Sequence, residues 1–158
     1  MRLLYAGLRV TNLRRSVQFY QRVLGLRVVR EGDTRSWGGG RWVTLEDPHS
    51  HRKIELNWYP RGSLFYRKYS AGESLDHLDF TVGAVSAERF AKLFRELIKR
   101  GGAPTKYRPE TTEGWMGCIT DPDGIWIVIG RSPTPAERRA MHPPSPKARA
   151  RSRRRKTG

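Results

Sequence analysis

A repeated pattern is the sequence feature that most limits how this chain can fold. An Asp-Pro turn at 47–48 leads into a strand-like run at 53–58, and a second Asp-Pro turn at 121–122 leads into a run at 125–130. Self-similarity of this kind indicates repeated structural units, each of which needs its neighbour to bury a core. The same order of elements is therefore expected upstream of each turn.

The first copy begins with a strand and a helix. Apolar and polar residues alternate over 2–10, which predicts a half-buried strand. Asn12 can cap a helix whose apolar positions keep helical spacing until Gly25. Strand-like runs follow at 26–31, 41–46 and 53–58.

The second copy has the same βαβββ order. A strand at 75–83 precedes Ser86, which can cap a helix that ends at Gly101. Strand-like runs follow at 104–107, 115–120 and 125–130. We predict one α+β domain at 1–131, with module one at 1–58, a linker at 59–73 and module two at 74–131.

Positive charge is concentrated in the C-terminal segment. The net charge is +16, and residues 141–158 hold seven lysines or arginines and no acid. Prolines and a lack of apolar residues predict that the basic tail at 132–158 is disordered. The tail can contact nucleic acid or another polyanion non-specifically. We favour a solubilising role, because no aromatic residue is interleaved to stack on bases.

Cysteine content and hydropathy indicate the cellular compartment of the protein. Cys118 is the only cysteine, which excludes a disulfide framework and a thiolate zinc site. No apolar run reaches membrane-spanning length, and the N-terminus lacks a signal sequence. We expect a cytoplasmic protein without membrane contact.

Alternation also defines the strand face that points away from the helices. In the first strand of each copy this row contains Tyr5 and His77, and in the last strand it contains Glu55 and Val128. Tyr5 therefore corresponds to His77 across the duplication, and Glu55 corresponds to Val128. Other members of these rows are Gly7, Arg9, Lys53, Asn57, Asp79, Thr81, Trp126 and Gly130.

Residues 1–130 resemble the vicinal oxygen chelate superfamily of glyoxalases, bleomycin resistance proteins and dioxygenases, and within it most closely glyoxalase I (lactoylglutathione lyase). The resemblance is carried by the segments 1–10, 15–26, 54–56, 68–77 and 121–124. It implies that the two modules form a cupped mixed sheet with the helices outside. It also implies a divalent metal ion (Ni, Zn, Co, Mn or Fe) in the cup and a homodimer, since such cups are often shared between chains.

The resemblance also assigns roles to the four corresponding positions, where the family typically holds its metal through His or Glu. Glu55 and His77 match these ligand types. Tyr5 is an uncommon ligand that must lose its proton, and Val128 has no donor atom. We therefore expect an incomplete metal site, which Tyr5, Asp79 or substrate oxygens would have to complete.

The leading hypothesis is a metal-dependent lyase or isomerase that acts on a small α-oxo or thiol-conjugated substrate. Glu55 would be a ligand or the general base, because a carboxylate beside a metal-stabilised enediolate can move a proton between adjacent carbons. A structural alternative pairs Glu55 with a neighbouring Arg9 or Lys53. The expected substrate contacts are Arg9, Asn57, Asp79 and Trp126, with Arg9 on an anionic conjugate such as glutathione.

Two other functions remain open, so whether the chain is an enzyme is not decided by the sequence. The first is a non-enzymatic small-molecule-binding protein resembling bleomycin resistance proteins, favoured by the two lost ligand positions and by aromatic residues that include Trp126. The second is a divergent extradiol dioxygenase relative, which would need His and Glu where Tyr5 and Val128 stand.

Overall fold

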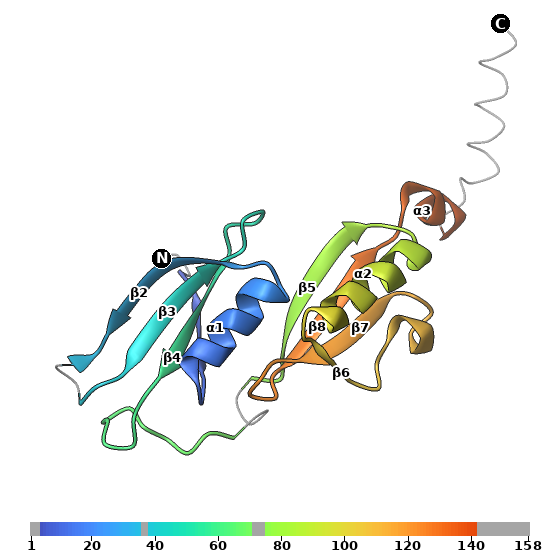
Figure 1. The fold of residues 1–158 in the computed structure, drawn as a ribbon. Helices are drawn as coiled ribbons and strands as arrows, with labels where there is room; N and C mark the ends of the chain where they lie inside the picture. The colour runs from blue at the N-terminus through green and yellow to red at the C-terminus, as the bar shows by residue number, and fades with distance from the viewer. Residues whose placement is uncertain (1–3, 36–37, 71–74, 142–158) are drawn as a thin grey trace, which may run out of the picture.

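Two four-stranded mixed sheets, one for each copy of the repeat, form the framework of the protein (Figure 1). The structure is a computed structural model that describes residues 4–35, 38–70 and 75–141. Module one consists of β1 (Ala6–Arg9), α1 (Leu13–Arg22), β2 (Arg27–Asp33), β3 (Arg41–Glu46) and β4 (Lys53–Trp58). Module two consists of β5 (His77–Ala84), α2 (Ala87–Lys99), β6 (Ala103–Pro104), the short 3-10 helix η2 (Pro109–Thr111), β7 (Met116–Thr120) and β8 (Trp126–Ser132), followed by α3 (Pro135–Met141).

The strand order is the same in both sheets. It is β1-β4-β3-β2 in module one and β5-β8-β7-β6 in module two, and the first pair of each sheet is parallel while the others are antiparallel. The α+β class and the tandem βαβββ duplication are therefore confirmed.

Local sequence signals explain where the two long helices begin. The Asn12 side chain accepts a hydrogen bond from the Arg15 backbone N–H at 3.0 Å, and Ser86 accepts one from Arg89 at 3.2 Å. Both are N-cap interactions, which satisfy a backbone donor that has no partner inside the helix. Gly25 follows α1 with a φ of 74°, a left-handed conformation that stops the helix.

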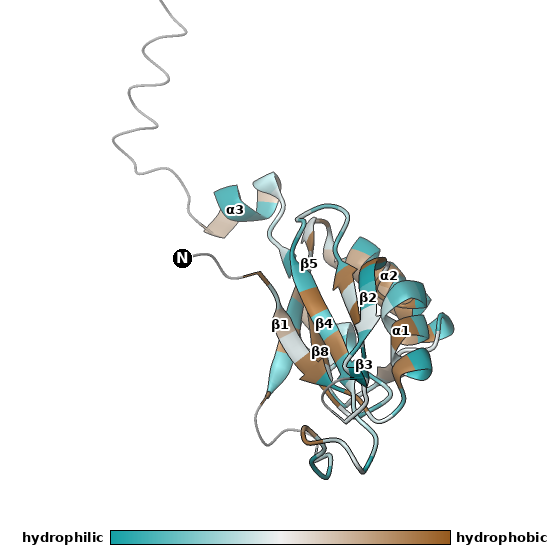
Figure 2. Ribbon diagram, turned by 90° about the vertical axis from the view of Figure 1, so that its left-hand side faces the viewer, coloured by the Kyte–Doolittle hydropathy of each residue, from teal (hydrophilic) through white to brown (hydrophobic). Residues whose placement is uncertain are grey.

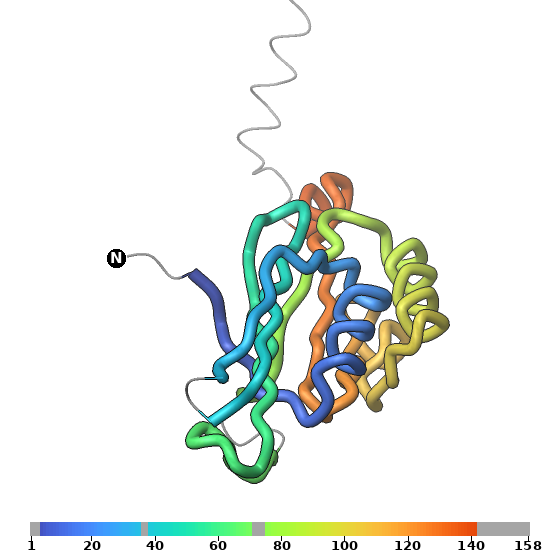
Figure 3. Tube along the Cα trace, turned by 60° about the vertical axis from the view of Figure 1, so that its left-hand side comes forward, coloured from blue at the N-terminus to red at the C-terminus, as the bar shows by residue number. Residues whose placement is uncertain are grey.

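Both helices lie on the same side of the two sheets (Figures 2 and 3). One cluster of buried side chains joins the modules and includes Tyr20 and Leu56 from the first and Phe90 and Ile127 from the second. Gly117 allows α2 to pack closely, because a Cβ there would lie 2.4 Å from the Phe94 ring. The opposite face of each sheet carries no helix, and this open face holds the polar rows predicted from the sequence.

Two elements differ from the sequence prediction. The strand expected at 104–107 is limited to Ala103–Pro104, because Pro104 has no N–H to continue the ladder. The backbone still follows β7 for a few residues, since the Thr105 N–H donates to the Cys118 carbonyl at 2.9 Å and the Cys118 N–H donates to the Tyr107 carbonyl at 2.8 Å.

The second difference is in the expected disordered tail at 132–158, of which residues 135–141 form α3. Glu137 forms a two-point ion pair with Arg131, with both N–O distances 2.8 Å. Its carboxylate also accepts the Thr134 N–H at 2.7 Å, and Thr134 Oγ1 accepts the Glu137 N–H at 3.2 Å. This reciprocal cap starts the helix. Residues 142–158 lie outside the described part of the chain.

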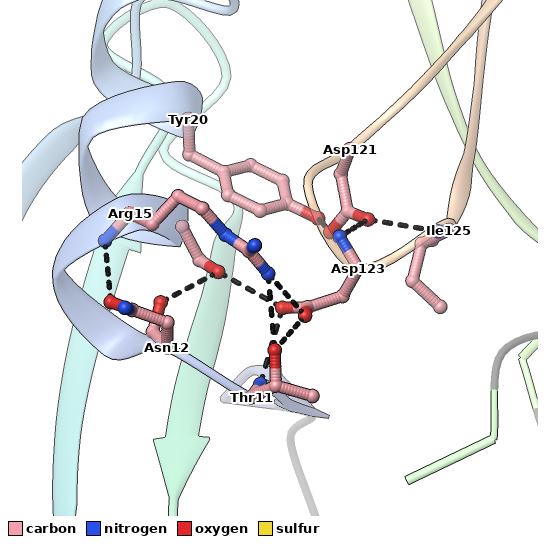
Figure 4. Close-up of polar contacts among 8 residues, drawn as sticks. Thr11, Asn12, Arg15, Tyr20, Asp121, Asp123 and Ile125 are labelled. Carbon is pink, nitrogen blue, oxygen red and sulfur yellow. Dashed lines mark hydrogen bonds and ion pairs between the residues drawn. The ribbon is translucent and has the colours of Figure 1, made fainter.

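The contact between the modules is built around a buried carboxylate (Figure 4). The turn between β7 and β8 places Asp123 at the N-terminus of α1, with its side chain only 2% exposed. Arg15 Nη2 lies 2.8 Å from Asp123 Oδ1, Ser16 Oγ donates to Asp123 Oδ2 at 3.1 Å, and Thr11 donates through both its N–H and its hydroxyl. Asp123 therefore places a negative charge from the other module beside the N-terminus of α1, where the helix dipole favours it, while Asn12 remains the N-cap.

A second buried carboxylate supports the first. Asp121 Oδ1 accepts the N–H groups of Asp123 and Ile125 at 2.9 and 2.8 Å, which shapes the turn. The Tyr20 hydroxyl of α1 donates to Asp121 Oδ2 at 3.0 Å. Burial raises the pKa values of both Asp121 and Tyr20 above their usual ranges. Tyr20 therefore stays protonated and remains the donor of this contact between the modules.

No helix in the described ranges is long and apolar enough to cross a bilayer.

We predict that Asp123→Ala lowers the free energy of unfolding by about 2–4 kcal/mol, because it removes a buried charge and leaves several donors of α1 without an acceptor. Urea denaturation measures this change. Asp33→Ala is the matched control, since Asp33 forms an exposed ion pair with Arg35 and should cost at most about 1 kcal/mol. Equal losses in the two variants would contradict the structural role of Asp123.

The α3 contact should depend on pH. Arg131 lowers the pKa of Glu137 from 4.5 to about 2. A lowered folded-state pKa gives stability that is present in full above the unfolded-state pKa and is lost as the pH falls through the folded-state pKa. The difference in unfolding free energy between wild type and Glu137→Gln should therefore be constant above about pH 5 and shrink as the pH falls toward 2. A difference that stays constant down to pH 3 would refute this assignment.

Candidate functional site

Glu55 lies in the middle of the open face of module one. Its Cα is paired with those of Gly7 and Thr44, while the adjacent Leu56 points into the core. Thr44 is 3% exposed and donates its hydroxyl to Glu55 Oε2 at 3.2 Å. Glu55 is thus a partly buried carboxylate oriented by one neutral donor.

The two cations that could have neutralised Glu55 have other partners. Lys53 Nζ pairs with Glu46 at 3.1 Å, and Arg9 Nη1 donates to the Phe65 carbonyl at 2.6 Å. No ion pair of Glu55 is found within the described residues. The structural alternative of an ion pair with Arg9 or Lys53 is therefore wrong.

Arg9 lies where β1 meets the linker. Its guanidinium carbon is 5.2 Å from the centre of the Tyr59 ring. Two cavities of about 220 and 460 Å³ share Arg9, Arg67 and Tyr69 as lining residues, and Arg61 and Lys68 each line one of them. Among the described residues, no acidic side chain lines either cavity. The cations give this region a positive charge that suits an anionic group, and the role of Arg9 as a substrate contact stays a prediction.

Tyr69 is a site residue whose environment the sequence did not reveal. Its hydroxyl is buried and has no hydrogen-bond partner among the described residues. Burial, with a smaller effect of Asp121 and Asp123, raises the pKa of Tyr69 to about 12. The hydroxyl therefore stays protonated. In the sequence, only the position of Tyr69 in the linker could have pointed to it. The burial of its hydroxyl is seen only in the folded chain.

Tyr5 and Asn57 occupy the same open face as Glu55. Tyr5 is two residues before Gly7 and is 41% exposed. Asn57 uses its amide nitrogen to donate to the Glu55 carbonyl at 3.2 Å and accepts the Tyr59 hydroxyl at 3.3 Å. Both the nitrogen and the oxygen of the Asn57 amide thus have partners within the chain. The Tyr5 side chain, in contrast, is exposed enough to contact a ligand.

The open face of module two carries His77, Asp79, Trp126 and Val128. In the parallel pair of β5 and β8, the Cα of His77 is opposite Trp126 and that of Asp79 is opposite Val128. His77 Nδ1 lies 2.8 Å from Asp76 Oδ2, an arrangement that leaves Nε2 for a ligand. Val128 contributes only apolar surface.

One chain does not bring these donors together. Glu55 belongs to the first sheet and Tyr5 directly precedes its strand β1, whereas His77 and Asp79 belong to the second sheet. In the described ranges, no group of three or more His, Cys, Asp or Glu residues is placed to hold a metal ion. The donor types suit a divalent ion, but among the described residues of one chain they lie on two different sheets.

Comparison with known proteins assigns the chain to a family. Residues 2–129 match the Glyoxalase/Bleomycin resistance protein/Dioxygenase superfamily. Lactoylglutathione lyase of Escherichia coli O157:H7 is 27% identical over 131 residues, which cover 82% of this chain and 91% of that protein. Lactoylglutathione lyase of Neisseria meningitidis serogroup A is 30% identical over 135 residues, which cover 80% and 88%.

Solved structures agree with this assignment. The trypanothione-dependent glyoxalase I of Leishmania major has a TM-score of 0.63 at 25% identity and covers 100% of this chain and 99% of its own. A fosfomycin resistance protein from Listeria monocytogenes shares the fold with a TM-score of 0.58 at 16% identity, over 87% of this chain and 94% of its own. The resemblance inferred from the sequence is confirmed, and the chain belongs to the Glyoxalase/Bleomycin resistance protein/Dioxygenase superfamily.

Proposed function

We propose that this protein is a glyoxalase-like lyase or isomerase that acts on a small α-oxo or thiol-conjugated substrate with the help of a divalent metal ion. The observation that carries the proposal is the Glu55 carboxylate, which is partly buried on the open face without a cationic partner. In a chain of net charge +16, a carboxylate kept apart from cations is available for proton transfer or for a metal. The relatives named lactoylglutathione lyase support the same reaction class.

In this proposal each residue has a distinct task. Glu55 takes a proton from one substrate carbon and returns it to the adjacent carbon. The cations around Arg9 hold the anionic end of the conjugate. Tyr5, Glu55 and His77 would hold the metal, which when bound supplies Lewis-acid stabilisation of the oxygen that becomes negative. Asp76 orients the His77 ring for that role.

We propose that the working form is a homodimer. Each module leaves one sheet face without a helix, and each open face holds half of the donor set (Figure 2). A two-fold axis would oppose module one of one copy to module two of the other and so create two equivalent cups. Such cups would unite Tyr5 and Glu55 of one chain with His77 and Asp79 of a second copy.

We also propose that the protein is cytoplasmic. Cys118 is buried in β7, and the chain has no second cysteine with which to form a disulfide.

Non-specific polyanion contact through the basic tail stays a prediction, and nucleic-acid retention before and after deletion of residues 142–158 would test it.

A non-enzymatic binding protein is the second candidate function. The observation that favours it is Val128, which puts apolar surface where the duplication predicts a counterpart of Glu55. Tight binding of a ligand by metal-free protein, without turnover, would support this reading.

Metal analysis separates the two functions. We predict that protein purified without chelators contains a divalent ion and that His77→Ala lowers its affinity at least about tenfold, the usual cost of a disturbed ligand set. Inductively coupled plasma mass spectrometry and a metal titration measure this. His51→Ala is the control, since His51 lies in an exposed turn beside Glu46. Wild-type protein that binds no metal above background would exclude the metal-dependent function.

Glu55→Gln tests the general base. We predict a decrease in kcat of about 10²–10⁴, because the amide cannot accept the proton. The rate of thioester formation from the glutathione–methylglyoxal hemithioacetal is the measurement. Glu46→Gln is the matched control, because Glu46 is on the neighbouring strand and pairs with Lys53. Activity that survives Glu55→Gln would remove Glu55 from the mechanism.

A further inference from the structure

A groove of about 640 Å³ lies on the helix side of module one, between the first turns of α1 and the sheet. Val17 of α1 and Val43 of β3 contribute apolar surface to it, beside the partly buried ring of Trp58. Three exposed charged side chains also line it, namely Arg14 of α1, Glu31 of β2 and Arg41 of β3. We call it the α1 groove. Its volume is within the range of small-molecule sites, about 300–1,000 Å³.

The two arginines of the groove are not neutralised by the chain. Among the described residues, neither Arg14 nor Arg41 forms an ion pair, and Glu31 forms none either. Arg41 is on the face of β3 that points toward the helices, because Val43, two residues later, is buried in the core. The groove therefore offers unpaired guanidinium groups next to apolar surface.

Module two has a related arrangement at the equivalent place. Counted from the two Asp-Pro turns, Trp115 stands at the position of Arg41. The Cα of Arg41 is paired with that of Trp58. Trp115 is joined in the same way to Arg131, whose N–H donates to the Trp115 carbonyl at 3.0 Å. Both modules therefore place an arginine and a tryptophan on neighbouring strands, in opposite order.

In module two a carboxylate completes this pair. The Arg131 guanidinium carbon lies 4.0 Å from the centre of the Trp115 ring, and Glu137 of α3 binds the same guanidinium through two contacts of 2.8 Å. The backbone also closes over the start of α2 here, since a Cβ on Gly114 would lie 2.6 Å from that of Ala87. In module one the corresponding space is the α1 groove, where an acid from a second molecule can take the place of Glu137.

We propose that the α1 groove binds a small organic monocarboxylate with an apolar body. The carboxylate pairs with Arg41 through two parallel hydrogen bonds, as Glu137 does with its arginine in module two. Arg14 adds a second positive charge. The apolar body covers Val17 and Val43 and so removes apolar surface from water.

The remaining charge in the groove restricts the ligand further. Glu31 repels a second carboxylate, so a monoacid binds better than a diacid of the same shape. The site is also separate from the cation-lined cavity of about 220 Å³ beside Arg9, with which it shares only Thr11 and Trp58 as lining residues. The proposal therefore goes beyond the proposed function and does not depend on turnover.

An NMR titration of the ¹⁵N-labelled full-length protein tests the site and its charge preference together. The probes are 3-phenylpropanoate, the neutral 3-phenylpropan-1-ol and the diacid phenylsuccinate. We expect 3-phenylpropanoate to bind at least about tenfold more tightly than the alcohol, the scale of one charge-assisted contact, and more tightly than the diacid. Its largest amide shifts should lie at residues 13–18 and 41–43.

Charge-removing variants locate the carboxylate. Arg41→Gln should weaken 3-phenylpropanoate at least about tenfold and leave the alcohol unchanged. Arg14→Gln should also weaken the acid alone, and it serves as the second variant if Arg41→Gln does not fold. Arg22→Gln is the matched control, because Arg22 is exposed in the last turn of the same helix. Arg61→Gln tests the neighbouring cavity and should have no effect.

Three results would overturn the proposal. The first is equal affinity of the acid and the alcohol. The second is tighter binding of the diacid than of the monoacid. The third is a loss of acid binding in Arg61→Gln but not in Arg41→Gln, with amide shifts confined to the linker, which would place the acid in the cavity beside Arg9.

Discussion

The buried carboxylate of Asp123 is the interaction on which the arrangement of the two modules depends. A carboxylate with a 2% exposed side chain needs several donors to offset its lost hydration, and here Thr11, just before α1, and the Arg15 and Ser16 side chains of α1 supply them. Asp121 adds a second contact through Tyr20. Together these contacts fix module two against α1, and they leave the helix-free faces of both sheets on the same side (Figure 2).

This arrangement determines what the site residues can do. Within one chain, Glu55 and His77 stand on different sheets, so neither half is a metal centre by itself. Charge is distributed unevenly between the halves. Module one and the linker combine the Glu55 carboxylate, which has no ion pair among the described residues, with the cations around Arg9. Module two combines His77 with exposed rings. The two faces are thus chemically different, and a shared cup would offer an anion-binding wall opposite an apolar one.

Much of the fold could be predicted because its signals are local. The caps Asn12 and Ser86, the alternating strands and the repeated turn need no knowledge of distant contacts. The face assignments of Glu55 and His77 followed from the period of two along a strand. The α3 helix had a readable signal in Thr134, Pro135 and Glu137, but the abundance of proline and basic residues was interpreted as disorder.

The features that sequence could not predict are long-range. Ser16 and Asp123 are 107 positions apart, and no local pattern marks them as partners. The same is true of Tyr107, whose place beside Trp126 depends on a short β6 and on contacts with Cys118. The buried hydroxyl of Tyr69 also emerges only when the linker folds over β1. Tertiary context decides such positions, so only part of the candidate site was recognisable in advance.

The two equivalent turns of the duplication have diverged and now make different contacts. In module one, Asp47 accepts the N–H groups of His49 and Ser50 within its own exposed turn. In module two, the turn shaped by Asp121 projects Asp123 onto the helix of the other module. The two modules therefore have different roles in the contact between them. Because His49 stands in module one at the position that Asp123 occupies in module two, only the second of these turns supplies a carboxylate to the helix of the other module.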